Sequence, residues 1–151
     1  AGVPADQRWE TIIMASVIQR ESGPDPEDMY KISRVFQNRL AQGMKMGSDV
    51  TTCYGAGLIG KDCLLITQAA LDDTSNLYNT RILPGLPIGP ISNPGAIAID
   101  AAYNPTDGPW IFFVTVNLST GETVFTETAA EHQAAVDQYY SWLEAHPEAV
   151  G

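Results

Sequence analysis

The sequence is poor in basic residues and in histidine, and each shortage excludes a class of function. Eight lysines and arginines stand against eighteen acidic residues, which gives a net charge of −10. No basic cluster is present to neutralise phosphates, so nucleic acids and anionic membrane surfaces are not expected partners. The two histidines, His132 and His146, match no metal-binding spacing, and no Cys-x-x-Cys motif occurs. We therefore expect neither a metal nor a cofactor.

Long apolar runs, signal peptides and lipidation motifs are also missing from the sequence. The chain opens at Ala1-Gly2-Val3-Pro4 without a methionine, so we expect a longer protein whose export signal or membrane anchor lies upstream. A length of 151 residues with 44% apolar composition is typical of one globular domain. No repeat or second domain is visible, and we expect residues 1–151 to form one monomeric domain.

The two cysteines, Cys53 and Cys63, lie ten positions apart in a glycine-rich segment. They could close a short disulfide loop in an oxidising compartment, and two buried free thiols are the alternative. A Cys53–His132 nucleophilic pair is disfavoured because Cys63 is so close. Residues 55–61 have the glycine spacing of a phosphate-binding loop, but Asp62 stands where Ser or Thr is needed and would repel phosphates. The Gly-x-Ser-x-Gly motif of serine hydrolases is absent.

Periodicity and capping residues predict a mostly helical chain with one β-hairpin, which is an α+β fold. The hairpin is expected over residues 110–117 and 122–126. Five helices are expected. The first carries an apolar stripe of Trp9, Ile12, Ile13 and Val17 and ends near Gly23-Pro24, and the second runs from an Asp25 cap to Gly43. The third covers residues 66–71, the fourth has an Asn93 cap with Pro94 in its first turn and runs through 96–103, and the last begins at a Thr128–Glu131 capping box.

Two segments are expected to be irregular. Residues 48–54 are predicted to be a loop rich in hydroxyl groups, with Tyr54 able to stack on a ligand. Residues 83–95 hold four prolines and three glycines, which rules out a helix or a central strand. Apolar neighbours favour a rigid wall packed on the core over a flexible linker.

Glu21 is the strongest candidate for chemistry. It falls in the last turn of the first predicted helix, where backbone carbonyls disfavour a negative charge and should raise its pKa. A carboxylic acid that keeps its proton near neutral pH can act as a general acid, and a solvated glutamate is the alternative. Acid catalysis on a glycoside also needs a cleft lined by aromatic and amide groups. The candidates for that lining are Tyr54, Tyr78, Asn79 and Asn93.

Four stretches, taken in order along the chain, resemble the endolytic murein transglycosylases, or YceG-like domains. They are Ala15-Ser16-Val17-Ile18-Gln19-Arg20-Glu21-Ser22; Phe36-Gln37-Asn38-Arg39-Leu40 with Gly43-Met44 and Ser48-Asp49; Tyr78-Asn79-Thr80 with 85–95; and Phe125-Thr126-Glu127-Thr128 with Glu131-His132. Together these stretches extend from about residue 15 to residue 136. The resemblance places Glu21 on the family's catalytic glutamate.

This resemblance implies a lysozyme-like cleft that cleaves the β-1,4 bond between N-acetylmuramic acid and N-acetylglucosamine without water, leaving 1,6-anhydro ends. Asp49, Thr51, Thr80 and Glu127 stand in or beside the matched stretches and join the candidate substrate-binding residues. The family's membrane helix and LysM-like subdomain would lie upstream, and the domain would act on the extracytoplasmic side of the bacterial membrane. Peptidoglycan glycan strands are the expected partner, with peptidoglycan synthases a further family expectation.

The sequence departs from the family pattern and leaves alternatives open. The departures are Val50, Arg81, Ile88, Gln133 and the cysteine pair. One alternative is a hydrolytic muramidase, which would need a second carboxylate from Asp25 or Asp49. Another is a peptidoglycan-binding module without turnover. Asp49 could equally order its own loop, residues 78–80 could pack the wall, and His132 is expected to be structural.

Overall fold

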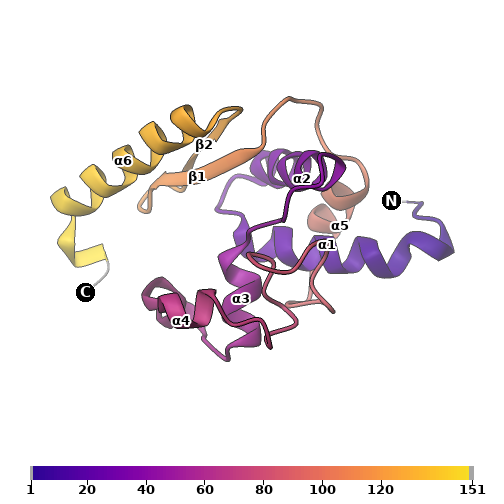
Figure 1. Ribbon diagram of the computed structural model, residues 1–151. Coiled ribbons are helices and arrows are strands. Elements are labelled where there is room, and N and C mark those ends of the chain that lie inside the picture. Colours follow the sequence, from indigo (N-terminus) through magenta and orange to yellow (C-terminus); the bar gives the residue numbers. More distant parts are fainter. Residues whose placement is uncertain (1, 150–151) are drawn as a thin grey trace.

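The computed structural model describes residues 2–149 and confirms the α+β class (Figure 1). Its elements are the 3-10 helix η1 (Ala5–Gln7), α1 (Arg8–Glu21), α2 (Pro26–Ala41), α3 (Asp49–Gly55), η2 (Gly60–Leu65), α4 (Gln68–Leu71), α5 (Ala96–Tyr103), β1 (Phe112–Asn117), β2 (Glu122–Thr126), α6 (Ala129–Ala145) and η3 (Pro147–Ala149). Across the described residues, no helix has both the length and the apolar character to cross a membrane.

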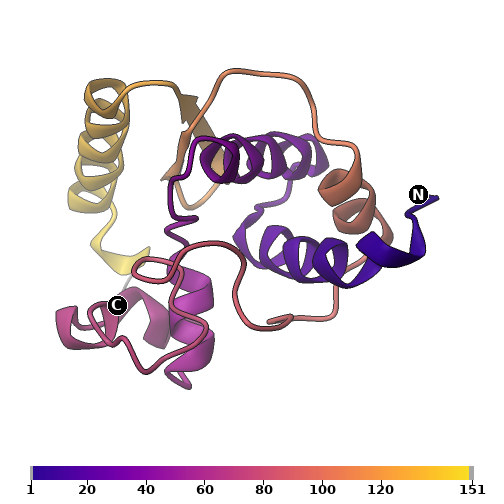
Figure 2. The ribbon, with the colours of Figure 1, turned by 45° about the vertical axis from the view of Figure 1, so that its right-hand side comes forward.

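The core forms where α1, α2 and α5 pack together. The second half of α1 is buried on nearly every side, from Ile13 to Ile18. The apolar stripe predicted for this helix is wrong at Trp9, which is 62% exposed. Figure 2 shows the N-terminal end of α1 (indigo) at the outer edge of the molecule, past the end of α2.

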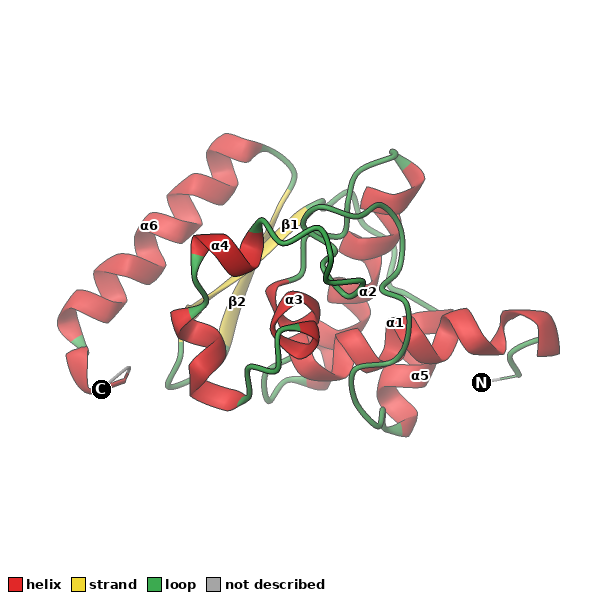
Figure 3. Cartoon of the chain, turned by 60° about the horizontal axis from the view of Figure 1, so that its bottom comes forward, coloured by secondary structure: helices red, strands yellow, loops and turns green. Residues whose placement is uncertain are grey.

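The Pro/Gly-rich segment 83–95 is the predicted wall. It forms neither helix nor strand and folds back against α1 (Figure 3). The buried Ser16 of α1 accepts two hydrogen bonds from this segment. Its Oγ accepts from the Ile91 amide at 3.0 Å, and its carbonyl accepts from Ser92 Oγ at 2.8 Å. The first bond satisfies the buried amide of Ile91, which a segment without secondary structure would otherwise leave unpaired.

Helix capping was predicted correctly for two helices and wrongly for one. Asp25 Oδ1 accepts from the Glu27 amide at 2.9 Å at the start of α2, and Thr128 and Glu131 form the capping box of α6. The cap of α5 is Gly95 and not Asn93, which lies exposed two positions earlier. Because α5 begins at Ala96, the proline precedes the cap and does not occupy the first turn.

The loop predicted for residues 48–54 is wrong, because Asp49–Gly55 is the helix α3. Threonine is a poor helix former, but here Thr51 and Thr52 are buried and both hydroxyls bond the Ser48 carbonyl, at 2.9 and 3.3 Å. Tertiary burial thus overrides local propensity. The Cys53–Cys63 disulfide is present and ties α3 to η2.

The predicted hairpin of β1 and β2 is confirmed as an antiparallel pair, with Phe113 opposite Phe125. Helix α6 packs on β1, so the hairpin and α6 form one side of the molecule. Figure 1 shows α3 and α4 on the other side, below the hairpin and α6. The end of α1 reaches the region between these two sides.

Candidate active site

A cleft of about 760 Å³ lies between the two sides, and Glu21 lines it. The last turn of α1 therefore delivers the candidate carboxyl group to a groove rather than to bulk water. Its remaining lining comes from α2, the segment after α2, the first residue of α3, Arg81, β1 and α6. The lining residues used below are Arg39, Lys45, Ser48, Asp49, Arg81, Phe112 and His132.

Glu21 has the properties of a general acid. Its pKa is raised from 4.5 to about 7: burial is the largest cause, a hydrogen bond from Ser48 opposes the rise, and the negative charge of Asp49 adds a smaller increase. The direction matches the expectation from the sequence, but the main cause is burial and not the helix carbonyls. Near neutral pH the carboxyl group therefore holds its proton for a substantial share of the time.

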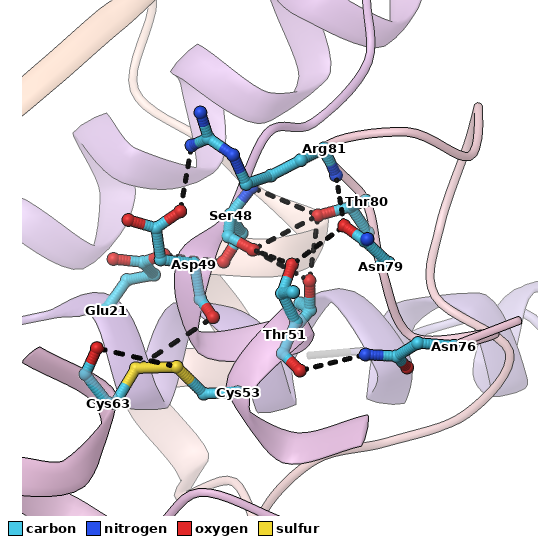
Figure 4. Close-up of a disulfide and its surroundings, with 11 residues drawn as sticks. Glu21, Ser48, Asp49, Thr51, Cys53, Cys63, Asn76, Asn79, Thr80 and Arg81 are labelled. Carbon is cyan, nitrogen blue, oxygen red and sulfur yellow. Dashed lines mark hydrogen bonds and ion pairs between the residues drawn. A yellow bond between two sulfur atoms is a disulfide. The ribbon is translucent and has the colours of Figure 1, made fainter. Parts of the chain in front are cut away.

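Ser48 is the partner of Glu21, and the sequence analysis did not single it out. Its hydroxyl donates to Glu21 Oε1 at 2.6 Å, which leaves Oε2 free to carry the proton (Figure 4). Ser48 is itself held in place by two hydrogen bonds: its amide donates to Thr80 Oγ1 at 3.0 Å, and its carbonyl accepts from the Thr51 hydroxyl. The available signal was its place beside Asp49 in one matched stretch.

Three predicted substrate-binding residues lie beneath the cleft without exposed surface. Thr51, Asn79 and Thr80 are at most 1% exposed, so in this structure none of them can contact a glycan directly. The hydroxyls of Thr51 and Thr80 share a hydrogen bond at 2.8 Å, and Asn79 Oδ1 accepts from Thr52 and from the amide of Arg81. Through these hydrogen bonds the buried side chains hold Ser48 and Arg81 in position.

Asp49 lines the cleft beside Glu21 and forms an ion pair with Arg81 at 2.8 Å (Figure 4). Both side chains are about half exposed, so solvent screens the pair. Asp25, the other carboxylate considered from the sequence, caps α2 and is not among the cleft residues. Only Asp49 of these two is placed where it could assist Glu21.

The remaining predicted contacts lie outside the cleft. Tyr54 and Tyr78 pack edge to face, with ring centroids 4.8 Å apart. Tyr54 and Asn93 line a separate depression that shares no residue with the cleft, while Tyr78 lines neither. Glu127 is exposed at the start of α6, where its amide bonds the Glu131 carboxylate. The structure therefore does not bring these four side chains to Glu21.

Across the cleft from Glu21, the side chains of His132 and Arg39 both pack against the ring of Phe112. His132 stacks on Phe112 at 4.9 Å, and the guanidinium of Arg39 lies 5.5 Å from the centre of the same ring. Burial and the nearby charge of Arg39 lower the pKa of His132, which favours a neutral imidazole. Among residues 2–149, no group of three His, Cys, Asp or Glu side chains is arranged to hold a metal ion.

The geometry defines a class of site: one protonated carboxyl group, oriented by a hydroxyl, in an open and partly polar cleft on a helical α+β scaffold. Residues 2–138 match the model of the YceG-like family, and the chain belongs to this family.

Known proteins agree with this assignment. Over 131 residues the chain is 37% identical to an endolytic murein transglycosylase of Bacillus subtilis (strain 168) and 28% identical to one of Streptococcus pneumoniae (strain D39). Each match covers 86% of this chain but only 34% and 23% of those proteins. A crystal structure of a YceG-like protein from Listeria monocytogenes superposes with a TM-score of 0.75 at 34% identity, covering 83% of this chain and 39% of that one. The chain thus spans between 23% and 39% of the length of these relatives.

Proposed function

We propose that this chain is the catalytic part of a lytic transglycosylase that cleaves peptidoglycan strands between N-acetylmuramic acid and N-acetylglucosamine. The observation that carries the proposal is the Glu21 carboxyl group, which lines the cleft with a pKa raised to about 7 and a hydrogen bond from Ser48. Membership in the YceG-like family and the similarity to endolytic murein transglycosylases support the substrate.

The proposed reaction uses one carboxyl group twice. Glu21 first donates its proton to the glycosidic oxygen, and the bond from that oxygen to muramyl C1 breaks. The C6 hydroxyl oxygen of the same muramyl residue then bonds to C1, and the Glu21 carboxylate takes the proton that this hydroxyl releases. The products are a free 4-hydroxyl and a 1,6-anhydro end. Water is neither added nor lost, and Glu21 finishes protonated.

A hydrolytic muramidase is the second candidate, because Asp49 lies in the cleft and its charge acts on Glu21. An inverting or retaining hydrolase needs a second carboxylate as base or nucleophile. The ion pair with Arg81 disfavours that role, since the guanidinium already occupies Oδ1 of Asp49. Asp25 supports this alternative less, because its carboxylate caps α2.

The proposal includes a location on the extracytoplasmic side of the membrane, where peptidoglycan lies. The Cys53–Cys63 disulfide supports it, because disulfides persist in oxidising compartments and are rare in the bacterial cytosol. A membrane anchor and contact with peptidoglycan synthases, both implied by the family resemblance, are parts of the same proposal.

The test is to digest purified sacculi with the wild type, Glu21→Gln and Glu10→Gln, and to weigh the released ends. The wild type should release fragments that are one water lighter than hydrolytic products. Glu21→Gln should lose at least about a hundredfold in rate yet still bind strands. Glu10→Gln, an exposed change on the same helix, should match the wild type. Fragments with the mass of hydrolysis products would favour the muramidase.

A binding module without turnover is the remaining alternative. It predicts that the wild type and Glu21→Gln bind strands equally and that neither releases fragments. Full release of anhydro ends by Glu21→Gln would also contradict the proposal, because the proposal assigns both proton transfers to the Glu21 carboxyl group.

A further inference from the structure

The cleft holds a large share of the basic side chains of this acidic protein. Arg39, Lys45 and Arg81 all line it, which is three of the eight lysines and arginines in a protein of net charge −10. They come from the end of α2, the segment that follows α2, and the residue after Thr80.

Two of these cations lack a counter-ion. Ion pairs within residues 2–149 join Arg81 to Asp49 and Arg34 to Asp107, so no carboxylate of that part of the chain lies within 4.0 Å of Arg39 or Lys45. Arg39 is about half buried, and both its burial and the charge of Arg81 lower its pKa. A partly buried, uncompensated guanidinium costs free energy that an incoming anion would recover.

A purely structural role explains only some of the hydrogen-bonding groups of Arg39, and it does not explain why Lys45 lines the cleft. One guanidinium nitrogen of Arg39, Nη1, donates to the Met46 carbonyl at 2.7 Å and so helps hold the segment after α2. Its Nε is buried and has no acceptor among the described residues. Lys45 is exposed and its side chain makes no hydrogen bond within residues 2–149. Neither cation is a partner of Glu21, which is bonded by Ser48.

The aromatic ring of Phe112 packs against the Arg39 guanidinium, with 5.5 Å from the guanidinium carbon to the ring centre. Such packing restrains the planar group, and because Nε is buried and Nη1 already donates one bond to Met46, the N–H groups left for the two parallel hydrogen bonds that a carboxylate accepts are those of Nη2 and the second one of Nη1. The site therefore fits a planar anion better than a single point charge.

We propose that Arg39 and Lys45 bind a carboxylate carried on the C3 substituent of the muramyl residue, so that the cleft selects strands whose substituents are charged. This inference rests on the proposed function. Muramic acid carries a lactyl group at C3, and the stem peptide is attached to it. When the scissile bond lies at Glu21, this substituent must extend along the same cleft. Both cations line that cleft. The carboxylate comes from the peptide on a substituted strand, and from the lactyl group itself once the peptide is removed.

The test compares three strands: peptide-bearing, peptide-bearing with its carboxylates converted to methylamides, and amidase-stripped with a free lactyl carboxylate. The proteins are the wild type, Arg39→Gln, Lys45→Gln and, as a matched control outside the cleft, Lys61→Gln. We expect methylamidation to raise the wild-type KM by about tenfold. Arg39→Gln should show that higher KM already on peptide-bearing strands, with no further rise on methylamidation. Lys45→Gln should show about a threefold rise because it is exposed.

The third strand identifies the source of the carboxylate. Wild-type KM on stripped strands that equals the peptide-bearing value shows that the free lactyl carboxylate can replace that of the peptide, and a value near the methylamide strand shows that only the peptide supplies it. Equal losses of the two variants on charged and blocked strands would overturn the inference and leave Arg39 a structural role. Lys45→Gln, which is exposed, keeps this test informative if Arg39→Gln unfolds.

The failure of this inference can be told from failure of the proposed function. The same comparison is made as equilibrium binding to Glu21→Gln protein, with and without each cation variant. If no strand is cleaved but binding still depends on the carboxylate and on Arg39, the function is wrong and the anion site stands. If strands are cleaved to anhydro ends but neither KM nor binding depends on the carboxylate, the anion site is wrong.

Discussion

Ser48 Oγ donates a hydrogen bond of 2.6 Å to Glu21 Oε1 from 27 positions further along the chain. This bond opposes the effect of burial and of Asp49 on the same carboxyl group. Figure 4 shows the three side chains together, beside Thr51 and Thr80, the threonine pair that supports Ser48. The proton affinity of Glu21 is therefore a balance of burial, one hydrogen bond and one neighbouring charge, and each can be changed separately.

The activity should fall as the pH rises through about 7, because Glu21 must start the reaction protonated and its pKa is raised to that value. Ser48→Ala removes the bond that lowers this pKa, so the fall should move to higher pH. Asp49→Asn removes the charge that raises the pKa, so the fall should move to lower pH. Profiles of kcat/KM from pH 5 to 9 measure both.

The exposed Asp6→Asn variant is the control for these profiles and should not move the fall in activity. Shifts of Ser48→Ala and Asp49→Asn in the same direction would contradict the assignment, as would an activity that rises above pH 7.

Glu21→Gln should stabilise the protein at alkaline pH. The pKa of Glu21 is about 7 when folded and 4.5 ordinarily, so between these values the folded state binds a proton that the unfolded state has released. Stability contributed by this group is thus complete below about pH 4.5 and lost as the pH rises to about 7. Urea unfolding at pH 8 should show the variant about 2–3 kcal/mol more stable than the wild type. The gain should vanish near pH 4.5, and a constant difference at both pH values would refute the buried-acid description.

Thr80→Val should damage catalysis through Ser48. The change keeps the shape of the side chain but leaves the amide of Ser48 without its acceptor, at a cost of about 1–3 kcal/mol in unfolding free energy. We expect kcat to fall while KM changes little, because Thr80 has no exposed surface for substrate. The exposed Thr74→Val is the matched control. A rise in KM alone would instead support the substrate contact predicted from the sequence.

Removing the disulfide should destabilise the chain by about 2–3 kcal/mol, the cost expected for a loop of this length. The double variant Cys53→Ala with Cys63→Ala avoids a free thiol, and urea unfolding measures the loss. Reductant should lower the stability of the wild type to that of the variant and leave the variant unchanged. A variant as stable as the oxidised wild type would show that packing alone holds η2 against α3.

Local sequence determined the parts of the fold that depend on neighbouring residues. The caps at Asp25 and Thr128, the hairpin and the proline-rich wall were predictable, because each rests on contacts or dihedral limits within a few positions. The place of Glu21 at the end of α1 follows in the same way. The cap of α5 was missed by two residues, which is an error of boundary and not of element.

Tertiary structure alone decided which polar residues reach the cleft. The Ser48 bond to Glu21 and the Ser16 bond to Ile91 join residues 27 and 75 positions apart, beyond any local pattern. The same long-range packing made a helix of the loop predicted for residues 48–54 and buried Thr51 and Thr80 beneath the cleft. Burial, the main cause of the raised Glu21 pKa, depends on the whole chain around the carboxyl group, so the sequence could place the acid but not show how it keeps its proton.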